Sequence, residues 1–234
     1  MAEVNLEIVS NVTERKISII LADDHPLLRH ALRDVLKKQT DFEIVAEAKD
    51  GIEAVKLATE LLPDIVVMDI SMPRLNGLEA TRQIKSRCPH IAILVLTVHS
   101  DNEHILGIFE AGAAGYLTKS AYEDEIVNAI RLVIAGEAVV PSSVFQQIFQ
   151  HTLKYMTKPI VLEAGEKLTA RELEILKLAA MGMNNKDIGR ELNISLRTVK
   201  YHLVEVFSKL NVSSRTEAVI TGLRAGLLTL NDLK

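Results

Sequence analysis

Five short apolar runs, each followed by a helical pattern, occupy the first half of the chain and restrict its fold more than any other feature. The runs are rich in β-branched residues and apolar throughout, which indicates strands buried on both faces and therefore a parallel sheet. The expected strands are Ile17–Ala22, Phe42–Ala46, Asp64–Met68, Ile91–Leu96 and Ala114–Leu117. The expected helices are Pro26–Lys38, Gly51–Leu61, Gly77–Arg87, Asn102–Ala111 and Tyr122–Ile134. This alternation predicts an α/β domain with a five-stranded, doubly wound parallel sheet.

Polar side chains stand at the carboxyl ends of four of these strands. They are Asp23, Asp24, Asp69, Thr97 and Lys119. A doubly wound sheet of flavodoxin-like strand order places its sites at this edge, so we expect these side chains to converge there. Taken singly, each has a structural explanation: an Asp as a turn residue or helix cap, a Lys as a solvated side chain, a Thr as part of the core. Their joint occurrence favours a shared site.

This set of side chains suits a divalent cation and a phosphoryl group. Mg²⁺ prefers oxygen ligands and is usually held by one or two carboxylates together with water and substrate oxygens. A carboxylate can also attack phosphorus and form an acyl phosphate. Lys119 and Thr97 are then expected to stabilise the phosphoryl oxygens on which charge builds. The sequence therefore predicts a magnesium-dependent phosphoryl site.

Charge divides the chain into two parts. Residues 1–136 carry 14 Lys and Arg against 21 Asp and Glu, whereas residues 167–234 carry 11 against 7. The basic second part suits a polyanion, although chance variation of the surface explains the difference equally well. We expect a disordered extension (1–15), an α/β domain (16–136), a linker with a helical segment near Ser143–Tyr155 (137–166) and a helical domain (167–234).

Composition also bears on location and partners. Cys88 is the only cysteine, so no disulfide can form within the chain. No apolar run is long enough to span a membrane, and the N-terminus has no signal-peptide pattern. These features favour a cytoplasmic protein with no membrane partner.

From Leu168 onward the pattern is helical only. Capping boxes mark the starts of a first and a fourth helix, formed by Thr169 with Glu172 and by Ser214 with Glu217. The second and third helices are expected at Lys186–Leu192 and Leu196–Leu210, joined by a short turn. These proportions predict a small all-α domain of four helices with a helix-turn-helix, whose helix Leu196–Leu210 would lie in the major groove of DNA.

The helix Leu196–Leu210 gathers its apolar residues on one face and leaves a mixed polar face outward. Outward Tyr201 and Val204 suit base edges and thymine methyl groups. Flanking cations and hydroxyls suit phosphates, which supply affinity without reading sequence. The candidate DNA contacts are Arg197, Thr198, Lys200, Tyr201, His202, Val204 and Lys209. His202 is also explained as a packed or solvated histidine, and Lys209 as a cation stabilising a helix C-terminus.

The segment Lys16–Ile134 resembles the receiver domains of two-component response regulators. The motifs that carry the resemblance are ADDHP, VVMDISMPRLNG, LT and GYLTK. The resemblance implies that Asp69 accepts a phosphoryl group from a phosphohistidine on a sensor histidine kinase. It also implies a set of Mg²⁺ ligands: Asp24 and Asp69 directly, Asp23 through water, and the backbone carbonyl of Ser71.

The same resemblance implies a conformational switch. Receiver domains switch through a hydroxyl residue and an aromatic residue, which here match Thr97 and Tyr116. Thr97 would move toward the phosphoryl group and the tyrosine ring would enter the vacated space, whereas the alternative for Tyr116 is a static packed residue. Ser71 and His99, two residues past Asp69 and Thr97, match positions that influence the lifetime of the acyl phosphate.

The stretch Leu168–Val219 resembles the four-helix LuxR-type DNA-binding domain. The resemblance is carried by LTARE, NKDI, LNIS, TVKYH and KL. It implies that Lys200 and Tyr201 approach bases, and that the helix Arg215–Ala225 forms a dimer contact through Arg215, Val219 and Leu223. Three positions depart from the family pattern and put the target sequence in doubt: Gly189 in place of alanine, Val204 in place of a basic residue, and the outward Glu205.

Together the two parts resemble a response regulator of the NarL/FixJ type. We expect phosphorylation of Asp69 to control DNA binding, either by freeing the Leu196–Leu210 helix from the receiver or by favouring a homodimer. Beyond its own phosphoryl transfer and dephosphorylation, no enzyme activity is expected. An aspartate-nucleophile phosphatase is one alternative, but Ser71 stands where such enzymes place a general-acid Asp. A DNA-binding regulator whose receiver no longer takes phosphate is another, and the five strand-end residues argue against it.

Overall fold

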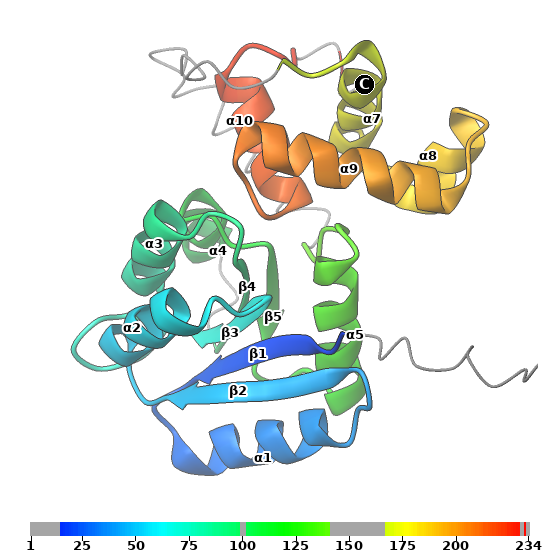
Figure 1. The fold of residues 1–234 in the computed structure, drawn as a ribbon. Coiled ribbons are helices and arrows are strands. Elements are labelled where there is room, and N and C mark those ends of the chain that lie inside the picture. The colour runs from blue at the N-terminus through cyan, green and yellow to red at the C-terminus, as the bar shows by residue number, and fades with distance from the viewer. Residues whose placement is uncertain (1–14, 99–101, 141–166, 230–231, 233–234) are drawn as a thin grey trace, which may run out of the picture.

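The computed structural model describes residues 15–98, 102–140, 167–229 and 232. It contains an α/β body followed along the chain by a helical body, seen in the lower and upper parts of Figure 1. The residues 1–14, His99 and the helical segment expected near Ser143–Tyr155 lie outside the described residues.

The α/β body is built on one five-stranded parallel sheet with the strand order β2-β1-β3-β4-β5. Its strands are β1 (Ile17–Ala22), β2 (Phe42–Ala48), β3 (Ile65–Asp69), β4 (Ala92–Thr97) and β5 (Gly115–Thr118). The connecting helices are α1 (Pro26–Lys37), α2 (Gly51–Leu61), α3 (Gly77–Arg87), α4 (Asn102–Glu110) and α5 (Glu123–Ile134). Helices α1 and α5 cover one face of the sheet, and α2, α3 and α4 cover the other (Figure 1). This arrangement confirms the predicted doubly wound fold.

Three strands end one residue later than the apolar runs predicted. β3 ends at Asp69, β4 at Thr97 and β5 at Thr118. The parallel register is the reason, because it pairs Asp69 with Leu96 and Thr97 with Thr118. Asp69 and Thr97 are therefore the last paired residues of their strands rather than the first residues of loops.

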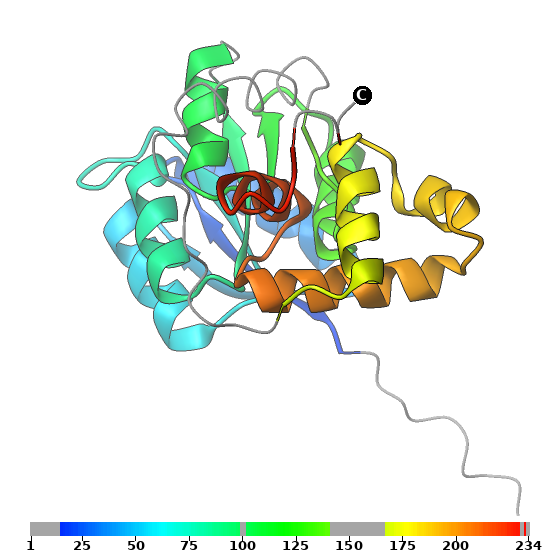
Figure 2. The ribbon, with the colours of Figure 1, turned by 90° about the horizontal axis from the view of Figure 1, so that it is seen from above.

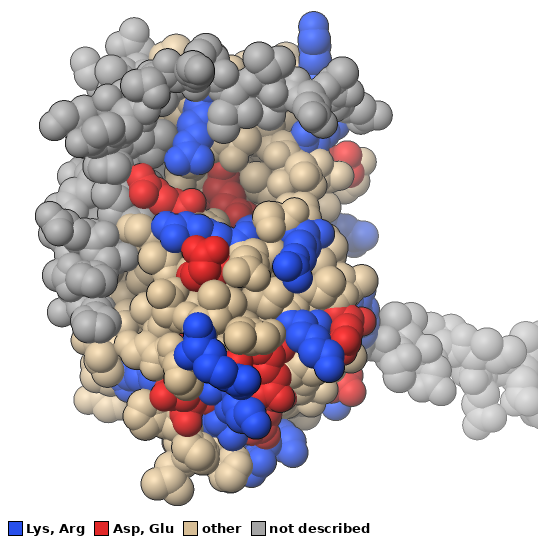
Figure 3. Space-filling view, turned by 90° about the vertical axis from the view of Figure 1, so that its left-hand side faces the viewer, with Lys and Arg blue, Asp and Glu red and all other residues tan. Residues whose placement is uncertain are grey.

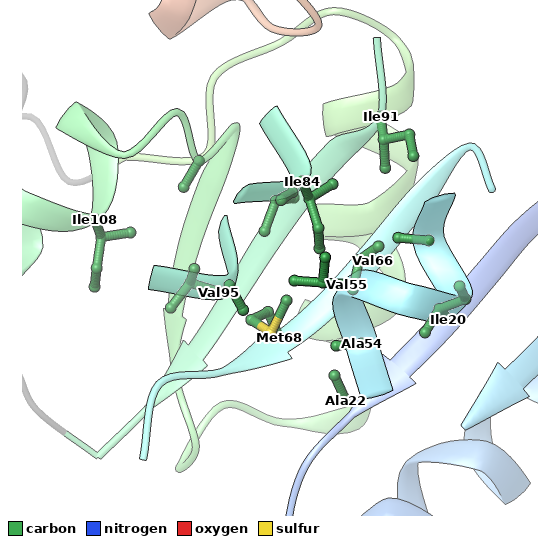
Figure 4. Close-up of a cluster of buried hydrophobic side chains, with 14 of the residues drawn as sticks. Ile20, Ala22, Ala54, Val55, Val66, Met68, Ile84, Ile91, Val95 and Ile108 are labelled. Atoms are coloured by element: carbon green, nitrogen blue, oxygen red, sulfur yellow. The ribbon is translucent and has the colours of Figure 1, made fainter. Parts of the chain in front are cut away.

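Apolar packing on both faces holds the strand ends in place. On the face covered by α2, α3 and α4, the buried side chains include Ala54, Val66, Met68, Ile84 and Val95 (Figure 4). A second buried cluster joins the opposite face to α1 and α5. Burying one Val, Leu, Ile or Met side chain stabilises a fold by about 1.5–3 kcal/mol. The sheet is thus a well-packed support for the polar residues at its carboxyl edge.

Close backbone contacts fix the loop that follows β3. The side chains of Asp50 and Asn76 cap α2 and α3 by accepting hydrogen bonds from backbone N–H groups of the first turn. A Cβ on Gly77 would lie 1.9 Å from the carbonyl oxygen of Asp69. Only glycine therefore allows α3 to begin so close to the end of β3.

The helical body consists of α7 (Ala170–Ala180), α8 (Asn185–Glu191), α9 (Leu196–Leu210) and α10 (Arg215–Arg224). The capping box of Thr169 with Glu172 is formed at α7, as predicted. The box predicted at α10 is only half formed. Ser214 accepts from the N–H of Glu217, but the Glu217 carboxylate accepts from the N–H of Ser213 instead of returning to Ser214.

The helical body rests on the α/β body through α9 and α10. Figures 1 and 2 show these helices lying across the end of the α/β body that carries α3 and α5. Ile220 of α10 belongs to the same buried cluster as the residues of α3 and α4. The two bodies therefore share apolar contacts as well as the polar contacts described below.

The surface that bears α2 and α3 shows Lys and Arg side chains interleaved with Asp and Glu (Figure 3). On this face, neither the acidic nor the basic side chains form a single large patch. None of the described helices is long and apolar enough to cross a membrane.

Candidate functional site

Four charged side chains predicted from the strand ends meet at the carboxyl edge of the sheet. Asp23 and Asp24 follow β1, Asp69 ends β3 and Lys119 follows β5. Asp23 and Asp69 are almost fully buried, while 29% of the Asp24 side chain is exposed. We call Asp23, Asp24, Asp69 and Lys119 the acidic pocket.

Lys119 binds two carboxylates at once. Its Nζ lies 2.9 Å from Asp23 Oδ2 and 2.7 Å from Asp69 Oδ2, with only 13% of the side chain exposed. Burial alone disfavours the charged ammonium, but hydrogen bonds and charge attraction from Asp69 and Asp23 outweigh it and raise the pKa of Lys119 above its ordinary value. The ammonium is thus held charged against the two carboxylates.

The acidic pocket fits a hard divalent cation. Potential ligand atoms of Asp23, Asp24, His25 and Asp69 all lie within 4.8 Å of one another. Three of these four groups are carboxylates, the ligand type that Mg²⁺ prefers, and one lysine does not balance three carboxylates. His25 was missed from the sequence, although its position beside Asp24 was a signal: its Nδ1 lies 2.9 Å from Asp24 Oδ1, and its backbone N–H donates to Asp23 Oδ1 at 2.8 Å.

The loop after β3 also contacts the pocket. The backbone N–H of Ser71 donates to Asp69 Oδ1 at 3.2 Å. This contact places Ser71 directly beside the carboxylate of Asp69, where its carbonyl was expected to serve as a ligand.

Thr97 and Tyr116 lie on neighbouring strands next to the pocket. Thr97 is fully buried, and its carbonyl accepts a hydrogen bond of 2.8 Å from the N–H of Lys119. Tyr116 is 5% exposed and belongs to a buried cluster with Ile105 and Phe109 of α4. The backbone of Thr97 is therefore joined to that of Lys119, and Tyr116 belongs to the cluster that α4 helps to form.

The helix α9 presents most of its predicted DNA contacts to solvent. Arg197 and Lys200 are exposed, and Tyr201 and Val204 are each 61% exposed. His202 is half-buried, with its ring centroid 5.7 Å from that of Tyr201 in an edge-on arrangement. Thr198 is also half-buried, and its hydroxyl lies 2.8 Å from Ser195 Oγ at the start of the helix.

Lys209 lies apart from this face. Its Nζ donates to both carboxylate oxygens of Glu172, at 2.8 and 2.9 Å, and only 12% of its side chain is exposed. Burial alone would raise the pKa of Glu172, but Lys209 and the cap residue Thr169 outweigh it and lower that pKa. The geometry indicates that Lys209 joins α9 to α7, which the sequence did not reveal.

The residues predicted for a dimer contact are buried in this arrangement. Arg215, Val219 and Leu223 are 3%, 2% and 1% exposed. Arg215 donates to the carbonyl of Ala179, at 3.1 Å, and to that of Met183. Burial lowers the pKa of Arg215 to about 10, against the attraction of a nearby glutamate.

A buried ion pair joins the two bodies at α3 and α10. Lys85 Nζ lies 2.9 Å from Glu217 Oε1 and 3.0 Å from Glu217 Oε2, and the two side chains are 9% and 10% exposed. Lys85 also donates to Ser213 Oγ and to the carbonyl of Pro89. Burial lowers the pKa of Lys85, and the attraction of Glu217 only partly opposes it.

A second polar contact joins the bodies at the end of α5. Glu137 accepts from the N–H of Asn185 at 3.0 Å and from Arg215 Nη1 at 3.4 Å. The Asn185 side chain donates in turn to the carbonyl of Ala135. We call the two contacts, Lys85 with Glu217 and Glu137 with Asn185 and Arg215, the seam.

The seam brings α9 close to the α/β body. Lys200 and Val204 line one surface cavity together with residues of the α/β body, among them His90, Arg131 and Ile134. Two residues of the candidate DNA-binding face therefore border a cavity shared with the other body, while both stay exposed.

Comparisons with known proteins agree with both halves of this description. Residues 19–131 match the family model described as response regulator receiver domain. Residues 166–221 match the model described as bacterial regulatory proteins, luxR family. The two matched segments correspond to the α/β body and the helical body.

Relatives match along most of the chain. Transcriptional regulatory protein LiaR of Bacillus subtilis is 42% identical over 204 residues, which cover 87% of this chain and 95% of that protein. The uncharacterized transcriptional regulatory protein YxjL of the same organism is 38% identical over 213 residues, covering 91% and 98%. A crystal structure of a LuxR-family two-component response regulator from Aurantimonas sp. has a TM-score of 0.53 and 39% identity, and covers 59% of this chain and 99% of that one.

Proposed function

The chain belongs to the two-component response regulators that join a receiver domain to a LuxR-type DNA-binding domain, and from this membership we propose that phosphorylation of Asp69 controls DNA binding by α9. The observation that carries the proposal is the bridge from Lys119 to Asp23 and Asp69 in a buried acidic pocket. We assign the receiver to residues 16–136, the linker to 137–166 and the DNA-binding domain to 167–234, and expect the protein in the cytoplasm.

The proposed reaction transfers a phosphoryl group to Asp69 from a phosphohistidine on a sensor kinase. A carboxylate oxygen of Asp69 forms a bond to phosphorus while the bond from phosphorus to the imidazole nitrogen breaks. The imidazole leaves with the electron pair of that bond and takes up a proton. Lys119, whose ammonium lies 2.7 Å from Asp69 Oδ2, is expected to stabilise the phosphoryl oxygens, and the Thr97 hydroxyl is expected to assist it.

Mg²⁺ is the proposed cofactor. We expect Asp24 and Asp69 to bind it directly, Asp23 through water, and Ser71 through its carbonyl. When bound, the cation neutralises part of the charge that develops on the phosphoryl oxygens. Its positive charge would also relieve the excess of carboxylates over ammonium groups in the acidic pocket.

Hydrolysis of the acyl phosphate by the receiver itself is also part of the proposal. Ser71, whose N–H already binds Asp69, and His99 are the positions expected to influence its rate. The second Asp of an aspartate-nucleophile phosphatase is replaced here by Ser71, which argues against hydrolysis of small phosphoesters as the main activity.

The proposed DNA interface is the exposed face of α9. Arg197 and Lys200 would contact phosphates, with Thr198 and His202 on the flank. Tyr201 and Val204 would contact base edges and thymine methyl groups. Lys209 is left out because its ammonium is already bound to Glu172.

We propose that the seam restrains DNA binding in the unphosphorylated protein. Lys200 and Val204 face a cavity shared with the receiver, so duplex DNA would need the seam to open. Val219 and Leu223, expected in a homodimer contact, pack in a cluster made of residues of the helical body, so opening the seam would not by itself expose them.

The test is labelling by acetyl phosphate in the presence of Mg²⁺. Wild-type protein should be labelled, and the label should disappear with excess EDTA and in Asp69→Asn. Asp34→Asn is the control, because Asp34 lies on α1 with 66% of its side chain exposed. Undiminished labelling of Asp69→Asn would place the acceptor elsewhere.

Binding of promoter DNA by the same proteins, with and without acetyl phosphate, tests the rest of the proposal. Phosphorylation should tighten binding by the wild type and by Asp34→Asn, but not by Asp69→Asn. DNA binding that is tight in all samples and indifferent to acetyl phosphate would instead favour a regulator whose receiver no longer takes phosphate.

A further inference from the structure

Arg29 of α1 reaches back over the start of its helix to the acidic pocket. Its Nη1 donates to the backbone carbonyl of Asp23 at 2.6 Å, and its side chain is 14% exposed. Arg29 also borders the same small internal space as Asp23 and Asp69. An arginine is thus built into the wall of the pocket, and neither the proposed reaction nor the proposed cation site uses it.

A glutamate holds the Arg29 side chain in this position. Arg29 Nε lies 2.9 Å from Glu47 Oε2, and Glu47 is the last residue but one of β2. The backbone N–H of Asp23 donates to the carbonyl of the next residue, Ala48, at 3.1 Å. The end of β2 therefore holds Asp23 twice, once through a backbone hydrogen bond and once through Glu47 and Arg29.

Arg29 and Lys119 contact the same aspartate in different ways. Lys119 binds a carboxylate oxygen of Asp23 and one of Asp69, and both carboxylates are among those expected to hold the cation. Arg29 binds the backbone carbonyl of Asp23 rather than a carboxylate oxygen. Lys119 therefore competes with a divalent cation for ligand atoms, whereas Arg29 does not.

Three carboxylates placed close together repel one another, so the backbone that carries them needs fixed anchors. A hydrogen bond from a charged donor to a backbone carbonyl is among the stronger anchors available. Partners that orient metal ligands without binding the metal are known to influence its affinity.

We propose that Arg29 is a positioning residue that holds the Asp23–Asp24 segment in the geometry that binds the divalent cation. The inference rests on the proposed function, because it concerns the same acidic pocket. Loss of Arg29 should weaken the binding of Mg²⁺ without removing a ligand and without disabling Asp69.

The experiment compares three variants of the full chain. Arg29→Met keeps the length of the side chain and removes its donors. Arg29→Lys keeps one charged donor but not the fork that reaches two partners. Arg33→Met is the matched control: Arg33 lies on the same helix and its Nη1 also contacts Glu47, at 3.3 Å, but it hydrogen-bonds Asp34 and Glu47 rather than Asp23.

Titration calorimetry with Mg²⁺ alone gives the first measurement. Arg29→Met should bind Mg²⁺ about tenfold more weakly than wild type, as is typical when a residue that orients metal ligands is lost. Arg29→Lys should fall between the two, and Arg33→Met should match wild type. A purely structural role would instead lower the melting temperature and leave the Mg²⁺ affinity of the folded protein unchanged.

The rate of labelling by acetyl phosphate, measured over a range of Mg²⁺ concentrations, gives the second. Arg29→Met should need more Mg²⁺ for half-maximal labelling but should reach the wild-type rate at saturation. A lower maximal rate with unchanged Mg²⁺ affinity would overturn the inference. So would an equal loss of Mg²⁺ affinity in Arg33→Met, which would assign the effect to Glu47.

The two proposals fail in different ways. If wild-type protein binds Mg²⁺ but is not labelled, the proposed function fails while the affinities still decide the role of Arg29. If the variants match wild type and all are labelled, the role of Arg29 is wrong and the proposed function stands. If Arg29→Met does not fold, the Mg²⁺ affinity of Arg29→Lys decides the role of Arg29. A wild-type affinity in Arg29→Lys would show that the guanidinium, with its two partners, is not needed.

Discussion

The acidic pocket and the seam both bury a lysine ammonium, but the number of carboxylates around it differs. In the pocket, Lys119 contacts Asp23 and Asp69, with Asp24 close by. In the seam, Lys85 contacts one carboxylate, that of Glu217. The pocket has more negative than positive charge, whereas the pair in the seam is balanced.

The pKa shifts of the two lysines point in opposite directions for this reason. Burial disfavours both ammonium groups, but two carboxylates outweigh it at Lys119 and raise its pKa. One carboxylate does not outweigh it at Lys85, whose pKa is lowered. An excess of carboxylates suits the binding of a cation. A balanced buried pair needs no ligand, and opens only when another interaction disturbs it.

The largest expected effect comes from removing the ammonium of the acidic pocket. Lys119→Met should slow labelling by acetyl phosphate by about 100-fold, the typical loss when a group that stabilises developing charge is removed. The same change should tighten Mg²⁺ binding, because no ammonium competes for Asp23 Oδ2 and Asp69 Oδ2. Labelling rates and Mg²⁺ calorimetry measure the two effects.

Opposite signs for these two effects are what the charge comparison requires. If Lys119→Met bound Mg²⁺ more weakly than wild type, competition between the Lys119 ammonium and Mg²⁺ would not be what limits the Mg²⁺ affinity of the pocket. Lys85→Met serves as the control, since its lysine is lost from the seam and labelling should be unchanged.

The seam should open when one partner of its buried pair is removed. Leaving a buried charge without its partner costs about 3–5 kcal/mol. In Lys85→Met the closed arrangement should therefore lose most of its advantage. Apparent affinity rises with the population of the competent state, so unphosphorylated protein should bind promoter DNA at least about tenfold more tightly.

The double variant separates an unpaired charge from general damage. Lys85→Met with Glu217→Gln leaves no buried charge without a partner, and the glutamine can still accept from Ser213. Its DNA affinity should return toward the wild-type value. Equal opening in the single and double variants would show that the lysine acts in some other way.

The charged residues of the acidic pocket could be predicted from the sequence because parallel strands all end at the same edge of the sheet. Alternating strands and helices predicted the sheet, and any parallel sheet places Asp23, Asp69 and Lys119 at one edge. Three strand ends were predicted one residue short, and that of β2 two residues short, since hydrogen-bonded pairing continued past the predicted ends. His25 and Arg29 contact Asp23 or Asp24 from the loop after β1 and from α1. The pattern of apolar residues does not predict such contacts.

The seam was not predictable in the same way. Lys85 and Glu217 are 132 residues apart. Lys85 resembles an ordinary helix-surface charge, and Glu217 was expected only to complete a capping box with Ser214. Lys209 resembled a cation available to phosphate, and in the structure it binds Glu172, 37 residues away, a contact that no local pattern indicated. Local patterns determine which residues lie on a helix face, but not which other element covers that face.

The second contact of the seam should have a smaller effect than the first. Glu137→Gln removes the charge opposite Arg215 while keeping an oxygen that can accept from Asn185. The loss of about 1 kcal/mol expected for one hydrogen bond corresponds to roughly fivefold tighter DNA binding by unphosphorylated protein. Electrophoretic mobility shifts on the same promoter fragment as for Lys85→Met would measure it.

Arg215→Met distinguishes a contact between bodies from one within the DNA-binding domain. Arg215 donates to the carbonyls of Ala179 and Met183 as well as contacting Glu137. Its loss should lower the melting temperature of the DNA-binding domain and weaken DNA binding, the reverse of Glu137→Gln. If both variants bound DNA more tightly, Arg215 would belong chiefly to the seam.

The smallest expected effect concerns α9 itself and shows whether the seam and the DNA compete for the same face. Lys200→Ala should weaken DNA binding and reduce the slope of log affinity against log salt by about 0.9, the value for one phosphate contact. The reduction should be the same in the Lys85→Met background, because an opened protein uses the same helix. Lys177→Ala is the control, since Lys177 lies on α7 beside Asp232, at 2.6 Å. A salt slope that changes only in the closed background would mean that Lys200 acts on the seam rather than on DNA.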